Sequence, residues 1–157
     1  MVLNAAVTPF AIAESDIGLP ANWRIGPSTA AAAVPLNLQL AFTPSGRGLR
    51  PYSPAKLRGV PQPGGDILLT WLRRTRASSG DSWVLVDVPL NEFTEAYDLE
   101  ILNGAAVVRT GSGLAIPSFL YTTAMMLADL GGLVSTLRIR VYQIGALGRG
   151  GAAEALV

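Results

Sequence analysis

Glycine and proline are spread along the whole of this chain, and they limit what it can fold into. The 157 residues include 17 glycines and 11 prolines. Both residue types disfavour the interior of a helix, so turns are frequent and long helices are disfavoured. Between the turns, apolar and polar residues alternate over short segments, which is the pattern of half-buried strands. The sequence therefore predicts an all-β fold.

Strand patterns recur from the first quarter of the chain to its end. The clearest alternation lies at 36–42, where four large apolar residues share one face: Leu36, Leu38, Leu40 and Phe42. Further strands are predicted at 23–25, 56–60, 66–73, 83–89, 96–101, 136–144 and 152–157. Strands with one apolar and one polar face are typical of an antiparallel sandwich.

Two local signals mark connections between these strands. Asn103-Gly104 is a two-residue hairpin signal. A short helix is predicted at 123–130, because Thr122 can cap its N-terminus and Gly131 follows its end.

A stretch rich in proline and glycine divides the chain. Proline fixes φ and donates no hydrogen bond, so this stretch cannot form a long central strand. We predict an N-terminal β arm or small β subdomain over 1–50 and a Pro/Gly-rich linker with an edge strand over 51–65. A β-sandwich is predicted over 54–147, and a C-terminal strand or tail over 148–157.

Composition excludes several classes of function. The chain has no cysteine and no histidine, so disulfides, thiolate metal sites and histidine bases are absent. We therefore expect no cofactor, no metal and no enzymatic activity. Net charge is +1, too near zero for a dedicated nucleic-acid binder. No apolar run approaches the roughly 20 residues of a membrane span.

Asp98 and Glu100 are the only carboxylate pair that invites a catalytic interpretation. Two residues apart on a strand, they share one face at roughly 6.5–7 Å, a spacing that superficially suits a glycosidase. Nothing nearby in the sequence favours a protonated carboxyl. The alternative is structural, with the two acids facing Arg138 and Arg140 across neighbouring strands, each pair contributing about 0.2–1 kcal/mol.

Several motifs, taken in order, resemble one known family. They include FTPSGRGLRP at 42–51 and DILLTWLRRTR at 66–76, followed by shorter matches at 80–83, 88–90, 95–101, 107–110, 140–144 and 148–150. This series is similar to the C-terminal part of the host-specificity, or tail-hub, "megatron" proteins of gene transfer agents and related siphophages. The resemblance covers roughly 23–150. It departs at Gly111-Ser112-Gly113, which interrupts a continuous strand of the family.

The resemblance implies a fibronectin type III-like sandwich at the distal end of a tail, within a trimeric hub. It implies a virion location at the tail tip, after synthesis in the host cytoplasm. Partners would be further copies of the chain and other hub proteins. Whether a host glycan or lipopolysaccharide is bound directly stays open. Family members are longer, and no activity of their upstream domains carries over to this chain.

High hydropathy indicates that some apolar surface is covered by a partner. Half of the residues are apolar and the mean hydropathy is +0.38. The strand at 83–89 is apolar on both faces, which makes it central or an interface. We predict these interface residues: Trp83, Leu85, Phe119, Met125 and Met126. Trp71, in the middle of a strand, is predicted to lie in the core.

Arg73, Arg74 and Arg76 follow a predicted strand and lead into a loop. They can contact phosphates of lipopolysaccharide or DNA, although solvated or interface arginines are the more ordinary interpretation. We predict surface contacts here but reject nucleic-acid binding, because no aromatic residues alternate with the arginines.

Together these observations predict a structural or adhesive component of a tail tip. Its recognition loops are predicted at 75–81 and 111–118, since loops on a rigid sandwich commonly carry binding. The alternative is a free carbohydrate-binding or cell-adhesion module, which exposed aromatic residues would favour.

Overall fold

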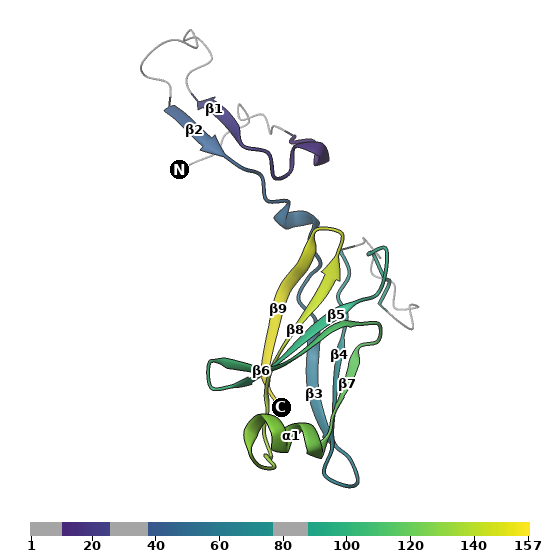
Figure 1. Cartoon of the computed structure of the whole chain (residues 1–157). Helices are drawn as coiled ribbons and strands as arrows, with labels where there is room; N and C mark the ends of the chain where they lie inside the picture. Colours follow the sequence, from purple (N-terminus) through teal and green to yellow (C-terminus); the bar gives the residue numbers. More distant parts are fainter. Residues whose placement is uncertain (1–10, 26–37, 77–87) are drawn as a thin grey trace, which may run out of the picture. The chain divides into compact units, whose positions relative to one another are not determined.

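The chain forms two compact units, Met1–Gly48 and Leu49–Val157. The computed structural model describes residues 11–25, 38–76 and 88–157. Figure 1 shows the elements in chain order. Within these residues, the first unit contains a two-stranded hairpin and the second a sandwich of seven strands. The predicted boundary near residue 50 falls close to the division between the units.

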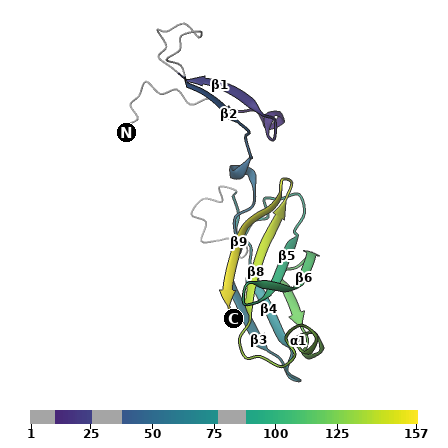
Figure 2. The same ribbon diagram turned by 60° about the vertical axis from the view of Figure 1, so that its left-hand side comes forward.

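Two antiparallel sheets make up the sandwich. The three-stranded sheet has the order β3-β4-β7, and the four-stranded sheet has the order β6-β5-β8-β9. Figure 2 shows them as two layers. Their strands are β3 (Ala55–Pro61), β4 (Ile67–Leu72), β5 (Tyr97–Asn103), β6 (Ala106–Leu114), β7 (Ser118–Tyr121), β8 (Arg138–Gly145) and β9 (Gly148–Leu156). This strand order confirms the predicted all-β, fibronectin type III-like sandwich.

The core lies between the two sheets and follows from the alternation in the sequence. Trp71 is buried, as predicted, and its ring meets that of Tyr97 edge-on at 5.5 Å between centroids. Such aromatic pairs contribute about 0.5–1.5 kcal/mol beyond the area that they bury. The remaining buried residues of this cluster are Leu69, Leu99, Ile101, Tyr121, Met126, Leu137, Ile139 and Val141.

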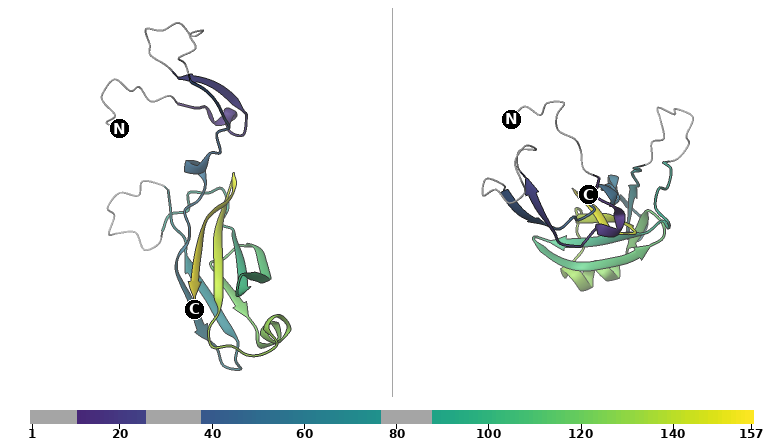
Figure 3. Two further views of the ribbon diagram at one scale, coloured as in Figure 1. Left: turned by 90° about the vertical axis from the view of Figure 1, so that its left-hand side faces the viewer. Right: turned by 90° about the horizontal axis from the view of Figure 1, so that it is seen from above.

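The predicted helix is present as α1 (Thr123–Leu130), with the predicted caps. The Thr122 hydroxyl accepts a hydrogen bond from the Met125 backbone N–H, and Gly131 ends the helix at a φ of 74°. The Asp66 carboxylate accepts a second bond from the Thr123 N–H at 2.8 Å, which fastens α1 to the start of β4. Figure 3 shows α1 at the end of the sandwich opposite the β8–β9 turn.

Three polar side chains hold α1 to the sheets. Tyr121, at the end of β7, donates a hydrogen bond to Asp129 at 2.9 Å. Arg109 of β6 pairs with the same carboxylate through two nitrogens. Hydrogen bonds from Arg109 hold the pKa of Asp129 below its ordinary value. The three residues join β6, β7 and α1.

Two connections differ from the sequence prediction. The β5–β6 turn consists of Gly104 and Ala105, one residue later than expected. The last strand was predicted from residue 152, but β9 already begins at Gly148. Gly150 lies so close to Pro51 that a Cβ there would overlap the Pro51 carbonyl oxygen. The strand or tail predicted over 148–157 is thus a full strand of the four-stranded sheet.

The first unit has a simple architecture. Strands β1 (Ala21–Ile25) and β2 (Leu38–Phe42) pair antiparallel, with Trp23 opposite Leu40. A 3-10 turn, η1 (Glu14–Asp16), precedes β1, and a second, η2 (Arg47–Leu49), follows β2. The predicted strands are confirmed, and all five residues of β2 are exposed. A two-stranded ribbon has no second layer against which to bury a face.

Candidate binding surfaces

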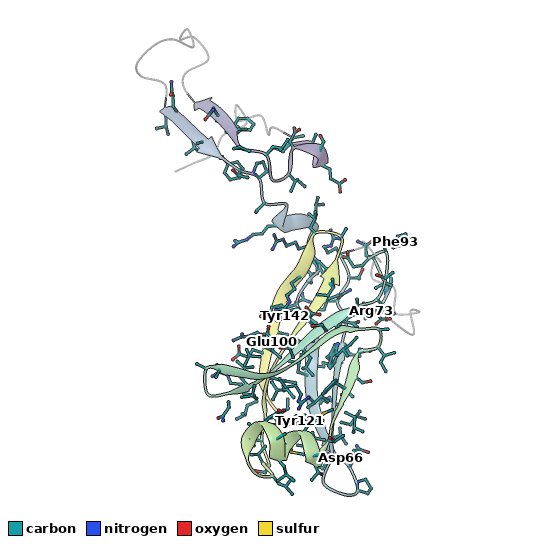
Figure 4. The ribbon with its side chains drawn as sticks, in the orientation of Figure 1. Asp66, Arg73, Phe93, Glu100, Tyr121 and Tyr142 are labelled. Atoms are coloured by element: carbon teal, nitrogen blue, oxygen red, sulfur yellow. The ribbon has the colours of Figure 1, made fainter. Side chains whose placement is uncertain are left out.

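The outer face of the four-stranded sheet carries a closed network of ion pairs. Glu100 accepts hydrogen bonds from Arg140 of β8 at 3.2 Å and from Arg149 of β9 at 2.7 Å. Arg149 also pairs with Asp98 at 2.7 Å, and its guanidinium lies over the Tyr142 ring at 4.6 Å. Figure 4 shows Glu100 and Tyr142 side by side on this face.

The network continues across β9 to a third acid. Glu154 pairs with Arg140 at 2.9 Å and also with Arg138. Hydrogen bonds from Arg140 and Arg138 lower the pKa of Glu154, and bonds to Asp98 and Glu100 raise the pKa of Arg149. The predicted pairing is confirmed for Glu100 with Arg140. It is wrong for Asp98 and Arg138, because both find partners on β9.

This arrangement explains the Asp98 and Glu100 pair without catalysis. Each of these carboxylates accepts a hydrogen bond from the Arg149 guanidinium, which gives both acids a structural role. The three arginines and three acids of the network therefore pair with one another. Among the described residues, no group of three acids lies where it could hold a metal ion.

The outer face of the three-stranded sheet, the β3–β4–β7 face, is very different. Val60 of β3 pairs with Leu68 of β4, which pairs with Leu120 of β7. These three side chains form an apolar row opposite the buried side of the sheet, and Val60 and Leu120 are each 45% exposed. The three strands contain no acidic residue.

Two cations flank this apolar row. Arg58 lies on the same face, with Thr70 as its neighbour on β4. Lys56 sits in a bulge with a φ of 52°, a left-handed conformation that a non-glycine residue rarely adopts. A hollow of about 250 Å³ beside them is lined by Lys56, Arg58, Thr70, Trp71 and Leu72. An exposed apolar row beside positive charge makes this face a candidate binding surface.

A second apolar surface, the arm face, lies on the β1–β2 ribbon. Leu38, Leu40 and Phe42 alternate along β2, and Leu38 is 63% exposed. Ala21 pairs with Phe42, and Trp23 with Leu40, so β1 adds apolar side chains to the same face. Gln39 and Asn22 lie on the other face. The ribbon is therefore amphipathic.

The predicted surface arginines are mostly engaged within the chain. Arg73 pairs with Glu95 at 3.0 Å, and Arg76 pairs with Glu92 at 2.8 Å. Both side chains are largely buried, and the predicted contact with a partner stays a prediction. Arg74 is exposed and lies over the Tyr52 ring at 5.3 Å. It is the one of the three whose side chain lies on the surface.

The predicted interface residues fall into three groups. Trp83 and Leu85 lie outside the described residues. Phe119 and Met125 are partly buried and pack against the core. Met126 is 1% exposed and belongs to the core of its own domain. Its assignment to an interface is therefore corrected, because a residue buried by its own chain offers no area to a partner.

The predicted recognition loops are shorter than expected. The segment 111–114 belongs to β6, and Ser118 begins β7, which leaves 115–117 as loop. Residues 77–81 of the other predicted loop lie outside the described residues.

Sequence analysis missed the residues that distinguish the two outer faces. Lys56, Arg58 and Phe93 were not singled out, although Phe93 is 100% exposed. The sequence did contain one signal for Arg58. Arg58 and Val60 alternate with Leu57 and Gly59 along β3, so they share the outer face of a sheet whose strands contain no acid. Among the described residues, no helix has the length and apolar character of a membrane span.

Comparisons with known proteins give only structural likenesses. No family model matches the chain, and no curated protein is similar to it in sequence. Domains d3–d4 of the extracellular region of rat CD45 share 13% identity at a TM-score of 0.47, covering 100% of this chain and 72% of that one.

Two further likenesses cover the sandwich region. A myokine shares 13% identity at a TM-score of 0.43, over 68% of this chain and 95% of that one. The FN5 domain of Drosophila Lar shares 15% identity at a TM-score of 0.39, and the match covers 68% of this chain and 94% of that one. At these identities the likeness concerns the fold alone, and the strand order of the chain itself defines its sandwich.

Proposed function

We propose that this chain is a non-catalytic structural or adhesive component of a phage or gene-transfer-agent tail tip. The tail-tip setting is supported by the sequence resemblance to tail-hub proteins over roughly 23–150. The binding role is supported by one observation above the others. The β3–β4–β7 face exposes an apolar row beside two cations, without any acid on its strands.

A partner that covers this face gains binding free energy by burying its apolar side chains. Burying an aliphatic side chain completely contributes about 1.5–3 kcal/mol. A half-exposed Val60 or Leu120 therefore contributes about 1 kcal/mol when a partner covers it. The sandwich supplies a rigid support, so little conformational entropy is lost on binding. The mechanism is assembly through preformed surfaces.

Antibody labelling of intact particles tests the proposal. Serum raised against this chain is applied to whole particles, which are then viewed by electron microscopy. Label confined to the distal tip of the tail supports the proposed role. Unlabelled particles, together with free chain in the medium, would overturn the tail-tip setting and favour an independent adhesion module. Serum against a capsid protein is the control for particle integrity.

A carbohydrate-binding or cell-adhesion module is the second candidate, and one side chain favours it. Phe93, in the connection between β4 and β5, is fully exposed, and Figure 4 places it near the β8–β9 end of the sandwich. An exposed aromatic ring can stack on a sugar. If this function is correct, Phe93→Ala lowers binding to a glycan array about ten-fold, whereas Leu133→Ala, at another exposed apolar position, does not. Equal binding by both variants would reject it.

A further inference from the structure

Two cations of β3 have no acidic partner in the described part of the chain. Most of the arginines described in the sandwich do pair with an acid of the same unit: Arg73, Arg76, Arg109, Arg138, Arg140 and Arg149. Lys56 and Arg58 differ from these, and the three strands of their sheet contain no acidic residue. Both cations line the same hollow of about 250 Å³.

Lys56 reaches this hollow from a strained backbone conformation. Lys56 and Leu57 together lie opposite Trp71 of β4, which makes a β-bulge in β3. A bulge redirects the side chains next to it, and the φ of Lys56 is 52°. This left-handed conformation is unfavourable for a non-glycine residue, and strain of this kind is concentrated at binding sites. The bulge therefore brings the ammonium group to the same hollow as the Arg58 guanidinium.

A hydroxyl group adds a neutral hydrogen-bond donor to the hollow. Thr70 of β4, which lines it, pairs with Arg58 of β3 and with Ser118 of β7. The three side chains therefore form one polar row across the outer face of the sheet. Arginine, lysine and hydroxyl groups are the donors that bind phosphate oxygens. A phosphate monoester carries about −1.5 to −2 charge at pH 7, so it can use both cations, whereas a carboxylate carries a single charge.

The size and the apolar wall of the hollow extend the match to a sugar. A cavity of about 150 Å³ holds benzene, so a hollow of about 250 Å³ has room for a six-membered ring with one phosphate group. Leu72 and Trp71 line it beside the cations, and apolar side chains pack against the C–H groups of a sugar ring.

We propose that this hollow binds a phosphorylated sugar, with Arg58 and Lys56 against the phosphate and Thr70 donating a hydrogen bond to it. The inference rests on the proposed adhesive function, and it names the class of surface glycan that the chain contacts. Because the cations are at the protein surface, the binding weakens as ionic strength rises.

Titration of the isotopically labelled, full-length chain with glucose 6-phosphate tests the proposal by NMR. The amide resonances of Arg58 and Thr70 should shift, whereas that of Val107, on the other sheet, should not. Glucose lacks the phosphate and inorganic phosphate lacks the ring, so each should bind about ten-fold more weakly. Equally tight binding of glucose would overturn the role of the phosphate. Equally tight binding of inorganic phosphate would overturn the role of the sugar.

Matched variants separate binding from folding. Arg58→Gln should weaken binding of glucose 6-phosphate about ten-fold. Arg138→Gln makes the same change of charge on the other sheet and should leave the affinity unchanged. Lys56→Gly should also weaken binding, yet its Tm should not fall, because glycine adopts a φ of 52° without strain. Wild-type affinity in Arg58→Gln or in Lys56→Gly would contradict the proposed site.

A short single-stranded oligonucleotide is the remaining probe. If it binds more tightly than glucose 6-phosphate, the phosphate belongs to a nucleic acid and the proposal is overturned. All of these measurements use the isolated chain, so they can fail while the labelling of particles at the tail tip succeeds. Failure of the sugar site and failure of the tail-tip role are therefore distinguishable.

Discussion

Replacing Glu100 by glutamine should destabilise the sandwich through its ion-pair network. The side chain of Glu100 is 12% exposed and accepts hydrogen bonds from Arg140, Arg149 and Tyr142. A hydrogen bond to a charged group contributes about 1.5–3 kcal/mol. Arg149 is 40% exposed and keeps Asp98 as a partner, and Arg140 keeps Glu154. Solvent screening and these remaining partners reduce the expected loss to about 1–2 kcal/mol.

Thermal and urea unfolding of the purified chain measure this loss. For a domain of this size, the expected decrease in Tm is about 4–10 °C. The difference from wild type should shrink at high salt, because the charges are partly exposed. Glu154→Gln, at the edge of the network, is the matched control and should cost less. A Glu100→Gln variant as stable as wild type at low salt would refute the reasoning.

Three other predictions concern packing and pH. Gly150→Ala should destabilise the chain by about 1–3 kcal/mol in urea unfolding, because the new methyl group meets the Pro51 carbonyl. Gly132→Ala, whose new methyl group meets nothing within 4 Å, should leave the stability unchanged. Equal losses of stability in the two variants would refute the packing argument. Burial, and then hydrogen bonding to Asp129, raises the pKa of Tyr121 from 10.0 to about 12. The folded state therefore keeps this proton after the unfolded state has lost it, so the free energy of unfolding should fall between pH 10 and 12. Tyr121→Phe should reduce the dependence of the free energy of unfolding on pH in this range. An unchanged dependence would contradict the raised pKa of Tyr121. Because Arg109 holds the pKa of Asp129 below the ordinary 3.8, stability should fall as pH drops below about 4. The Asp129→Asn variant should be less stable than the wild type at neutral pH, and the difference in their free energies of unfolding should shrink in acid. A difference that does not change with pH would contradict the lowered pKa of Asp129.

Local patterns predicted much of the sandwich. The caps of α1 and the alternation in β4, β5 and β8 depend on residues a few positions apart, so they can be read directly from the sequence. Trp71 was placed in the core for the same reason. The position of β9 was less clear, because the glycines from Gly148 to Gly151 look like a turn until the close approach of Pro51 is known.

Long-range contacts account for the errors at the candidate surfaces. Arg73 and Arg76 look free in the sequence, yet their partners Glu95 and Glu92 lie at the far end of the connection between β4 and β5. Asp98 meets Arg149, which is 51 residues away. The alternation at 36–42 correctly indicated a strand, but alternation cannot show whether a second layer covers its apolar face.

Quantitative mass spectrometry of gradient-purified particles tests the tail-tip role most directly. Whole particles and detached tails are compared with the particle-free fraction of the same lysate. The proposed function predicts that the chain remains with both whole particles and detached tails, at a fixed and low copy number per tail. A chain found only in the particle-free fraction would contradict it.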